Sequence, residues 1–289
     1  MDEADHFDSF VARESVRFLE DYARTDEPFF LVTSFLKPHD PFMPAKRFAD
    51  MYRAEDMQLS PTWRSADLAH LPAEVRHFIQ TAPYTPELIE ASHARERMAF
   101  YYANLAQMDD CAGQVLSALK RLGLDRNTIV LYTSDHGEML GDLGLWNKFQ
   151  FYEGSCGVPL LARLPGASPA LCEQPVSLIS LKQTLAELCD LPDLGGSDGA
   201  SFASLIRNPS SARQDAPVFA EFNTGKPRAK YMIRRGDYKY THWVRDIDEL
   251  YNLREDPQET RNLASDPAHR ATVERLRSDL LAWHRPTEA

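Results

Sequence analysis

The sequence lacks features that mark whole classes of protein. No apolar run approaches the roughly 18 residues that a membrane-spanning helix needs, so we expect no contact with a membrane. Acidic residues outnumber basic ones by 43 to 32, and the net charge of −11 argues against a nucleic-acid-binding surface. Any anionic ligand must then be attracted by a local positive charge, and this favours a metal site.

Cysteine is also scarce. The spacings of Cys111, Cys156, Cys172 and Cys189 fit neither a zinc site nor a disulfide framework, so a reducing compartment, the cytoplasm, is favoured. No signal peptide is recognisable, which has weight only if the chain starts at the natural N-terminus. Cys156 has no evident base near it in the sequence, so a packing role is favoured over a nucleophilic one.

The residues that are present predict an α/β protein. At 289 residues and 43% hydrophobic content, the chain can form one large α/β domain or a domain with a satellite. Apolar spacing predicts helices at 8–23, 93–122 and 180–189, with Asp8 as a cap of the first and Gly123 ending the second. Short apolar runs predict buried strands at 29–35, 129–132 and 158–164.

The stretch 129–148 is the centre of the functional prediction. Its first four residues predict a strand buried on both faces, and Asp135 and His136 follow directly after it. Glycines then allow tight turns and close approach to a ligand. Because ligands of open α/β sheets collect at the carboxyl ends of strands, we expect a site here.

The residue types of this stretch suit an anion held by a cation. Asp135 offers a hard oxygen and His136 a borderline nitrogen, a pair that suits Ca²⁺, Mg²⁺ or Mn²⁺ better than structural zinc. Lys148 would add a fixed positive charge of the kind that stabilises anionic oxygens in a transition state. Metal and lysine together indicate a tetrahedral oxyanion as the ligand.

A second candidate lies after the run at 29–35. Pro38 and Pro41 bracket His39 and restrict the backbone around it, so its ring would be presented rigidly from a loop. On the residues alone, a turn histidine bonded to backbone and a functional histidine are equally favoured. For Lys37 a solvated charge is favoured over a second cation at the site.

Two other stretches carry weaker signals. Residues 43–92 have few apolar anchors and little periodicity, which indicates a substrate-side lobe with short helices. Asp109 and Asp110 lie within a long predicted helix, so a structural role is favoured over a metal or acid/base role.

The C-terminal part has a different pattern. Residues 191–215 are rich in Gly, Pro, Ser and Asp and predict a boundary, with domains at 1–208 and 209–289. Short runs at 218–222, 231–234, 238–241 and 249–253 predict a small antiparallel sheet, and a terminal helix should extend to about Trp283. We expect Arg234, Arg235 and Lys239 to form an exposed rim.

These motifs resemble the sulfatase family of the alkaline-phosphatase-like superfamily. The resemblance rests on SDHG at 134–137, LG at 140–141, GLWNK at 144–148, KPHDP at 37–41 and the C-terminal string MIRRGDYKY…LYNL…DPQETRNLA. It leans toward choline-sulfatase-like or related cytosolic members. It implies an alkaline-phosphatase-like sheet flanked by helices and incomplete at the N-terminus, with a small C-terminal antiparallel sheet plus helix.

The resemblance also implies roles for individual residues. Asp135 and His136 would be metal ligands, with Ca²⁺ favoured and Mn²⁺ or Mg²⁺ possible. His39 and Lys148 would contact the sulfate group and act in catalysis on a small-molecule or saccharide sulfate ester. Leu143 stands where many relatives have His, and we assign it no role.

One family motif is missing. Sulfatases act through a formylglycine made from Cys or Ser in a C/S-x-P-x-R motif, and no cysteine here has Pro two residues later. In the nearest serine match, Ser265-Asp266-Pro267, the arginine Arg270 falls one place late. We therefore expect a chain without the nucleophile-bearing first part, inactive by itself: a fragment, a misplaced start or a decayed gene.

Two alternatives stay open. A phosphonate monoester or phosphodiester hydrolase of the same superfamily would use a similar oxyanion site. A non-catalytic remnant that binds only metal or anion would keep the same residues without turnover. The oligomeric state cannot be predicted from the sequence.

Overall fold

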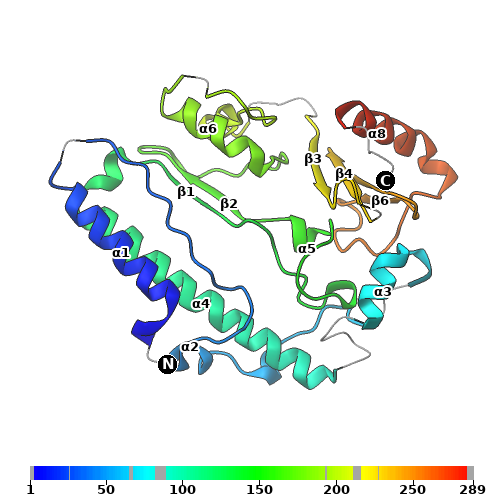
Figure 1. Cartoon of the computed structure of the whole chain (residues 1–289), viewed down its shortest axis with the longest axis horizontal. Helices are drawn as coiled ribbons and strands as arrows, with labels where there is room; N and C mark the ends of the chain where they lie inside the picture. Colours follow the sequence, from blue (N-terminus) through cyan, green and yellow to red (C-terminus); the bar gives the residue numbers. More distant parts are fainter. Residues whose placement is uncertain are drawn as a thin grey trace. The chain divides into compact units, whose positions relative to one another are not determined.

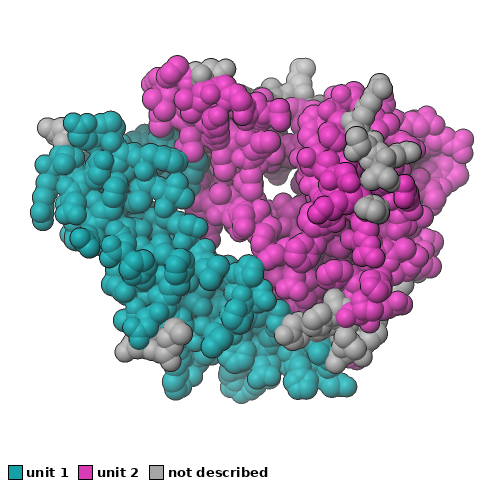
Figure 2. Space-filling model, in the orientation of Figure 1, with its two compact units in different colours: residues 1–59, 88–131, 162–166 teal, residues 60–87, 132–161, 167–289 magenta. Residues whose placement is uncertain are grey.

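The computed structural model describes residues 3–25, 27–64, 68–81, 89–192, 194–210, 216–226 and 228–284. The chain divides into two compact units, which Figure 2 colours separately. Unit 1 comprises residues 1–59, 88–131 and 162–166, and unit 2 comprises 60–87, 132–161 and 167–289. No helix among the described residues is long and apolar enough to cross a membrane.

Unit 1 is built on two packed helices. Helix α1 (Phe7–Tyr22) lies along α4 (Ala91–Arg121), as Figure 1 shows. Leu19 of α1 and Ala118 and Leu119 of α4 form a buried apolar contact. Both predicted helices are confirmed, and Gly123 adopts a left-handed φ of 72° just beyond α4. The unit also contains η1 (Glu3–Asp5), α2 (Lys46–Ala49), η2 (Ala54–Asp56) and η4 (Leu124–Asn127).

The predicted capping role of Asp8 is wrong. His6 occupies the N-cap position of α1, and Asp8 lies inside the first turn. The Asp8 side chain is 2% exposed and its Oδ1 accepts hydrogen bonds from the backbone N–H groups of Leu36 (2.7 Å) and Lys37 (3.1 Å). Asp8 therefore anchors the segment before His39 instead of capping its own helix.

The buried strand predicted at 29–35 is also corrected. The backbone there belongs to no strand within the described part of the chain. Exposure alternates along the run: Phe30 is 76% and Val32 70% exposed, while Phe29 and Leu31 pack against the α1–α4 contact. One face of the run is therefore exposed, and the prediction of a buried strand is wrong.

A two-stranded sheet holds the start of the signature loop. Strands β1 (Val130–Thr133) and β2 (Leu160–Arg163) form where the apolar runs predicted strands, and they pair with each other. The expectation that β1 is buried on both faces is wrong, because Tyr132 is 39% exposed. Leu161 of β2 is 59% exposed, so this sheet is half-exposed in the described residues.

The C-terminal part of unit 2 is an antiparallel sheet with a helix, as predicted. Strands β3 (Val218–Phe222), β4 (Lys230–Arg235), β5 (Tyr238–Trp243) and β6 (Glu249–Asn252) are hydrogen-bonded in that order. The register pairs Ile233 with Tyr240 and Tyr240 with Leu250. Helix α8 (Arg270–Trp283) packs on β4 and β5, and its Leu276 and Leu280 are fully buried there.

Shorter elements complete unit 2. They are η3 (Leu68–His70), α3 (Ala73–Thr81), η5 (Asp142–Gly144), α5 (Glu153–Cys156), η6 (Leu178–Ser180), α6 (Leu181–Leu188), α7 (Ala203–Arg207) and η7 (Pro267–His269). Helix α6 confirms the prediction at 180–189. Short helices also occur in the predicted lobe at 43–92, of which 65–67 and 82–88 lie outside the described residues. Within the predicted boundary at 191–215, residues 193 and 211–215 lie outside them as well.

Candidate active site

The signature loop, residues 134–148, begins with a local network around Asp135. Asp135 Oδ1 accepts from the backbone N–H of His136 (3.0 Å), and His136 Nδ1 lies 2.8 Å from the carbonyl oxygen of Gly137. His136 Nε2 is then left 3.6 Å from Asp135 Oδ2. A metal-binding histidine is usually oriented by such a bond from its other ring nitrogen to a carbonyl oxygen. Asp135 Oδ2 and His136 Nε2 thus lie close to each other as two potential metal donors. The Asp135 side chain is 86% exposed, so its oxygens are accessible.

The loop then doubles back, so that the residue before Lys148 pairs with its first half. The N–H of Gly141 donates to Leu145 O (2.7 Å), and the N–H of Met139 donates to Asn147 O (2.9 Å). Glu138 Oε1 accepts from the backbone N–H of Asn147 at 2.5 Å. The pairing therefore joins Met139, three residues after His136, to Asn147, and Lys148 is the next residue after this pair. Its ammonium lies 5.9 Å from the ring centre of Phe149.

Leu143, at the tip of the loop, has a structural position. It is 3% exposed, it adopts a φ of 53°, and its N–H donates to Thr62 Oγ1 (2.8 Å). Trp63 and Trp146 pack edge to face beside it, with ring centres 5.9 Å apart. The segment 60–63 therefore supports the loop through a hydrogen bond and a ring contact.

Gly137 is the point at which the loop touches the next helix. Its N–H donates to Ser155 O (2.7 Å), and a Cβ at position 137 would lie 2.2 Å from Gly154 O. No side chain fits in that space, so glycine is needed for contact and not for an unusual φ. The backbone of the Asp135–His136 segment is consequently seated on α5.

Helix α5 is in turn held by buried charges of the C-terminal sheet. Lys239 Nζ lies 2.8 Å from Glu153 Oε1 and 2.6 Å from Glu259 Oε1. Glu259 Oε2 accepts from the N–H of Glu153 (2.6 Å), and Arg234 Nη1 lies 3.3 Å from Glu153 Oε2. Burial acts to lower the pKa of Lys239, but the surrounding negative charges of Glu259 and Glu153 raise it above its usual range.

This cluster corrects the prediction of an exposed rim. The Lys239 side chain is 2% exposed, and those of Arg234 and Arg235 are each 28% exposed. Arg235 pairs with Asp279 of α8 at 2.6 Å. Sequence reasoning missed Glu153 and Glu259 because a charged residue usually faces solvent.

A second buried network fixes the residue before Glu153. Glu249, 2% exposed, accepts from Tyr152 Oη (2.6 Å), Tyr251 Oη (2.8 Å) and Trp243 Nε1 (2.7 Å). Burial raises the pKa of the Glu249 carboxyl, and the three donors oppose that rise. Tyr152 and Glu153 are thus both tied to the C-terminal sheet.

The surroundings of Cys156 agree with the packing role that the sequence favoured. Its Sγ donates to Phe151 O (3.1 Å), and burial raises the pKa of the thiol to about 11. A thiol with that pKa is protonated at neutral pH and is a poor nucleophile. All four cysteines are free.

His39 and Lys37 belong to unit 1. His39 Nδ1 lies 2.7 Å from Asp40 O and 3.2 Å from Asp40 Oδ1, with 42% of the side chain exposed. The prediction that Lys37 is a solvated charge is wrong. Its Nζ donates to Asn104 Oδ1 (2.9 Å) and Met43 O (3.0 Å), and burial lowers its pKa.

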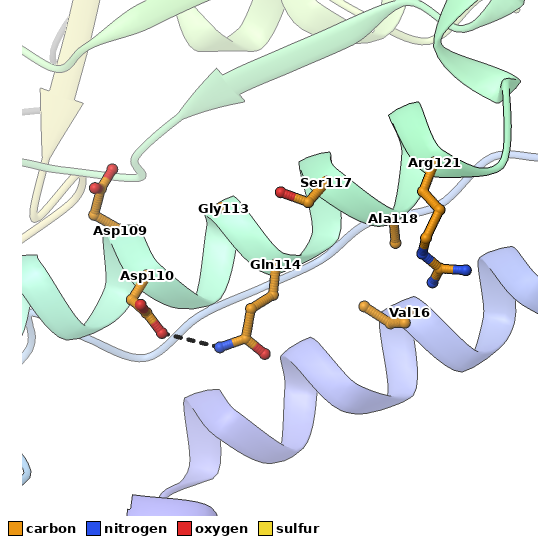
Figure 3. Close-up of a pocket in the computed structure, with 8 residues that line it drawn as sticks. All are labelled: Val16, Asp109, Asp110, Gly113, Gln114, Ser117, Ala118 and Arg121. Atoms are coloured by element: carbon orange, nitrogen blue, oxygen red, sulfur yellow. Dashed lines mark hydrogen bonds between the residues drawn. The ribbon is translucent and has the colours of Figure 1, made fainter.

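The aspartates of α4 have structural contacts. Asp110 accepts from Arg47 Nη2 (3.0 Å) and from Gln114 Nε2 (2.9 Å), and Arg47 also forms two bonds to Glu3. Figure 3 shows the shallow pocket between α1 and α4 to which Asp109 and Asp110 contribute, with Arg121 at its other end. Of the predicted site residues, none lines this pocket.

The side chains present fit a metal ion only in part. Asp135 and His136 provide two donors of suitable type, with Asp135 Oδ2 and His136 Nε2 on one side. Among the described residues there is no group of three or more His, Cys, Asp or Glu side chains that could hold a metal ion. Two donors are too few for a stable divalent-cation site, so a metal ion here would need further ligands beyond Asp135 and His136.

Comparison with known proteins identifies the family. The model of the Sulfatase family matches residues 2–191, and that of the N-sulphoglucosamine sulphohydrolase C-terminal region matches residues 141–285. This chain belongs to the sulfatase family. The family is part of the alkaline phosphatase superfamily. One relative of this sulfatase chain is a choline-sulfatase of Rhizobium meliloti (strain 1021), which is 31% identical over 97% of this chain and 56% of its own length.

Other relatives agree on the fold. An arylsulfatase of Clostridium perfringens (strain 13 / Type A) is 29% identical over 96% of this sulfatase chain and 57% of its own length. The structure of a phosphonate monoester hydrolase of Agrobacterium radiobacter aligns with a TM-score of 0.82 at 25% identity, over 98% of this chain and 61% of that one. This sulfatase chain therefore spans little more than half the length of the curated relatives it matches.

Proposed function

We propose that the chain is part of a sulfuric ester hydrolase that cleaves a sulfate monoester with the help of a divalent metal ion, Ca²⁺ in the first place and Mn²⁺ or Mg²⁺ otherwise. Family membership supports the hydrolase class. The observation that carries the proposal is the signature loop: Asp135 and His136 present two donors 3.6 Å apart, and backbone pairing brings Asn147, the residue before Lys148, back to Met139, three residues after His136.

The proposed substrate is a small-molecule or saccharide sulfate ester. One structure with the same fold, at 20% identity and a TM-score of 0.79, is described as a complex with its substrate D-glucosamine-2-N,6-O-disulfate. The choline-sulfatase relative makes a small sulfate ester equally suitable. The net charge of −11 means that such an anion is attracted by local cations and not by the whole molecule.

The finer organisation is also a proposal. The core would be an alkaline-phosphatase-like sheet flanked by helices, to which residues 1–208 contribute, and residues 209–289 would form the C-terminal sulfatase subdomain. The antiparallel sheet β3-β4-β5-β6 with α8 accords with the second part. In the first part β1 and β2 are paired, and residues 29–35 belong to no helix or strand.

In this scheme, each candidate residue has a separate task. The metal, when bound, would polarise the oxygens of the sulfate group. Asp135 and His136 would hold it, and the Lys148 ammonium would neutralise the negative charge that develops on those oxygens. His39 would contact the sulfate group and assist the leaving group by proton transfer.

Turnover by the 289 residues alone is not expected. The C/S-x-P-x-R motif that supplies the formylglycine nucleophile of the family does not occur in the sequence. The purified chain should therefore leave an aryl sulfate intact with or without added Ca²⁺. If it hydrolyses the ester in a metal-dependent way, the assignment of the nucleophile outside these residues is wrong. If the complete protein is also inert but binds sulfate, the non-catalytic reading replaces hydrolysis.

A phosphonate monoester or phosphodiester hydrolase is the second candidate. The structural match to the phosphonate monoester hydrolase at a TM-score of 0.82 favours it, because a tetrahedral oxyanion site can accept sulfur or phosphorus. The complete protein should be assayed with aryl sulfate and with a phosphonate monoester under the same conditions. A higher kcat/KM for the phosphonate would select this alternative.

For the metal donors, Asp135→Ala should abolish metal retention by the complete protein, since it leaves His136 without its neighbouring oxygen. Elemental analysis after gel filtration measures this directly. Asp109→Ala is the matched control, because Asp109 is an exposed carboxylate on α4. Unchanged metal content in Asp135→Ala would remove this aspartate from the site.

For the lysine, Lys148→Ala should lower kcat/KM of the complete protein by about a hundredfold to a thousandfold, the effect of losing one oxyanion-stabilising donor. Lys148→Arg keeps the charge and should lose less. Lys226→Ala, on an exposed turn of the C-terminal sheet, is the control and should change nothing. An unaltered kcat/KM in Lys148→Ala would mean that its charge does not reach the sulfate.

A further inference from the structure

We propose that Glu259, with Lys239, is a positioning residue that sets the conformation of the Asp135–His136 segment through helix α5. The inference rests on the proposed function, because it concerns the same loop. It assigns the C-terminal sheet a task in the site although its charged residues were predicted to lie on the surface.

The first step is the contact between Glu259 and the start of α5. Helix α5 has four residues and no side-chain cap, so its first N–H groups need partners from elsewhere. Glu259 Oε2 accepts from the N–H of Glu153 at 2.6 Å. Glu259 itself is 3% exposed and follows β6, more than a hundred residues later in the chain.

The second step is the charge balance that keeps Glu259 in place. Lys239 Nζ bridges Glu259 Oε1 (2.6 Å) and Glu153 Oε1 (2.8 Å), so one buried cation connects both carboxylates. Arg234 supports Glu153 from a second direction at 3.3 Å. A buried ion cluster costs desolvation energy, and its value is more often a fixed geometry than added stability. Here the geometry it fixes is that of α5.

The third step transmits the position of α5 to the loop. Gly137 N–H donates to Ser155 O (2.7 Å), and the space beside Gly137 is too small for a Cβ because Gly154 O lies there. A shift of α5 must therefore move Gly137 or break this bond. Gly137 directly follows His136, so the shift would change where the two proposed metal donors point.

The direct test is hydrogen exchange at the Gly137 amide, followed by NMR in the whole chain. In Glu259→Gln we expect exchange at Gly137 to accelerate by about tenfold or more, since a charge-supported contact on α5 is lost. The amides of Tyr231 and Ile233, in the core of the C-terminal sheet, should keep their rates. Asp279→Asn removes a different ion pair of the same sheet, with Arg235, and should leave Gly137 unchanged.

Three outcomes would overturn the inference: an unchanged rate at Gly137 in Glu259→Gln, equal acceleration at Gly137 and Ile233, or an equal effect of Asp279→Asn. If Glu259→Gln does not fold, Arg234→Gln removes only the more exposed partner of Glu153 and should still accelerate Gly137 selectively. Absence of that effect would also count against the inference.

A second measurement separates this inference from the proposed function. Titration of the complete protein with Ca²⁺ and Mn²⁺ alone should give weaker metal binding in Glu259→Gln than in the unmodified protein, and binding equal to the unmodified protein in Asp279→Asn. If the unmodified complete protein binds neither ion while Gly137 exchange still responds to Glu259, then the positioning holds and the assignment of Asp135 and His136 as metal donors fails. If metal binds equally to Glu259→Gln, the positioning is not needed by the site.

Discussion

Replacing Glu249 with alanine should lower the free energy of unfolding by about 4 kcal/mol, because it leaves three buried donors without an acceptor at about 1 to 3 kcal/mol each. The donors are the hydroxyl groups of Tyr152 and Tyr251 and the indole N–H of Trp243, all within 2.6–2.8 Å of the Glu249 carboxylate. The carboxylate is 2% exposed, so water cannot replace it without opening the core. Urea denaturation followed by tryptophan fluorescence measures the change.

Two variants make this test specific. Glu249→Gln keeps the shape and one acceptor oxygen, and should lose clearly less stability than Glu249→Ala. Glu255→Ala removes an exposed glutamate just after β6 and should stay within about 0.5 kcal/mol of the unmodified chain. If Glu249→Ala and Glu255→Ala have similar free energies of unfolding, the three hydrogen bonds do not contribute as the geometry indicates.

The C-terminal sheet was predictable because its signals are local. The runs around Phe219, Ile233 and Tyr240 and the Gly236–Asp237 turn indicate hairpins without reference to the rest of the chain. What local pattern could not give is which charges are buried. Lys239 looks like a solvent-facing lysine, and its partners Glu153 and Glu259 come from sequence positions far from β5.

The two errors at strands have one physical cause. An apolar run such as 29–35 indicates an extended backbone, but burial depends on what covers each face, and that is set by the tertiary structure. Phe30 and Val32 are exposed although they are as apolar as their partly buried neighbours Phe29 and Leu31. Tyr132 of β1 is exposed for the same reason.

For the site, sequence reasoning located the loop but not its supports. The SDHG motif and the residues after it indicated Asp135, His136 and Lys148 as candidates, and the loop pairs Asn147, the residue before Lys148, with Met139. Glu259 lies in the C-terminal string of the resemblance, but nothing in the sequence indicates that Glu138, Glu153 or Glu259 supports the loop. The structure shows these roles: the carboxylates of Glu138 and Glu259 accept hydrogen bonds from backbone N–H groups, and that of Glu153 pairs with Lys239 and Arg234.

Lys230 should make the stability of the chain rise with pH between about 8 and 10.5. Its side chain has no exposed surface, and burial lowers its pKa from 10.5 to about 8. Between these values the unfolded chain holds a proton on Lys230 that the folded chain has released, so the free energy of unfolding increases with pH. Below pH 8 both states are protonated and the cost of the buried charge is fully present. A shift of this size corresponds to about 3 kcal/mol.

The contacts of Lys230 explain why the charge is tolerated. Its ammonium donates to Gln150 Oε1 at 2.6 Å and lies 4.4 Å from the ring centre of Trp243 and 5.0 Å from that of Phe222. The Glu74 carboxylate lies 4.0 Å from the Lys230 ammonium. Ring faces and one amide oxygen attract the cation but replace its hydration only partly, so the neutral amine is favoured relative to water.

Lys230→Met tests this by removing the titrating group while keeping an unbranched apolar side chain against the rings. The free energy of unfolding of Lys230→Met minus that of the unmodified chain should be about 2 to 3 kcal/mol larger at pH 7 than at pH 10. Lys120→Met, at an exposed lysine of α4, should give a difference that does not change with pH. Urea denaturation at the two pH values supplies all four comparisons. A pH-independent difference for Lys230→Met would mean that the Lys230 ammonium stays charged in the folded chain throughout this range, and that the aromatic rings and Gln150 compensate for its lost hydration.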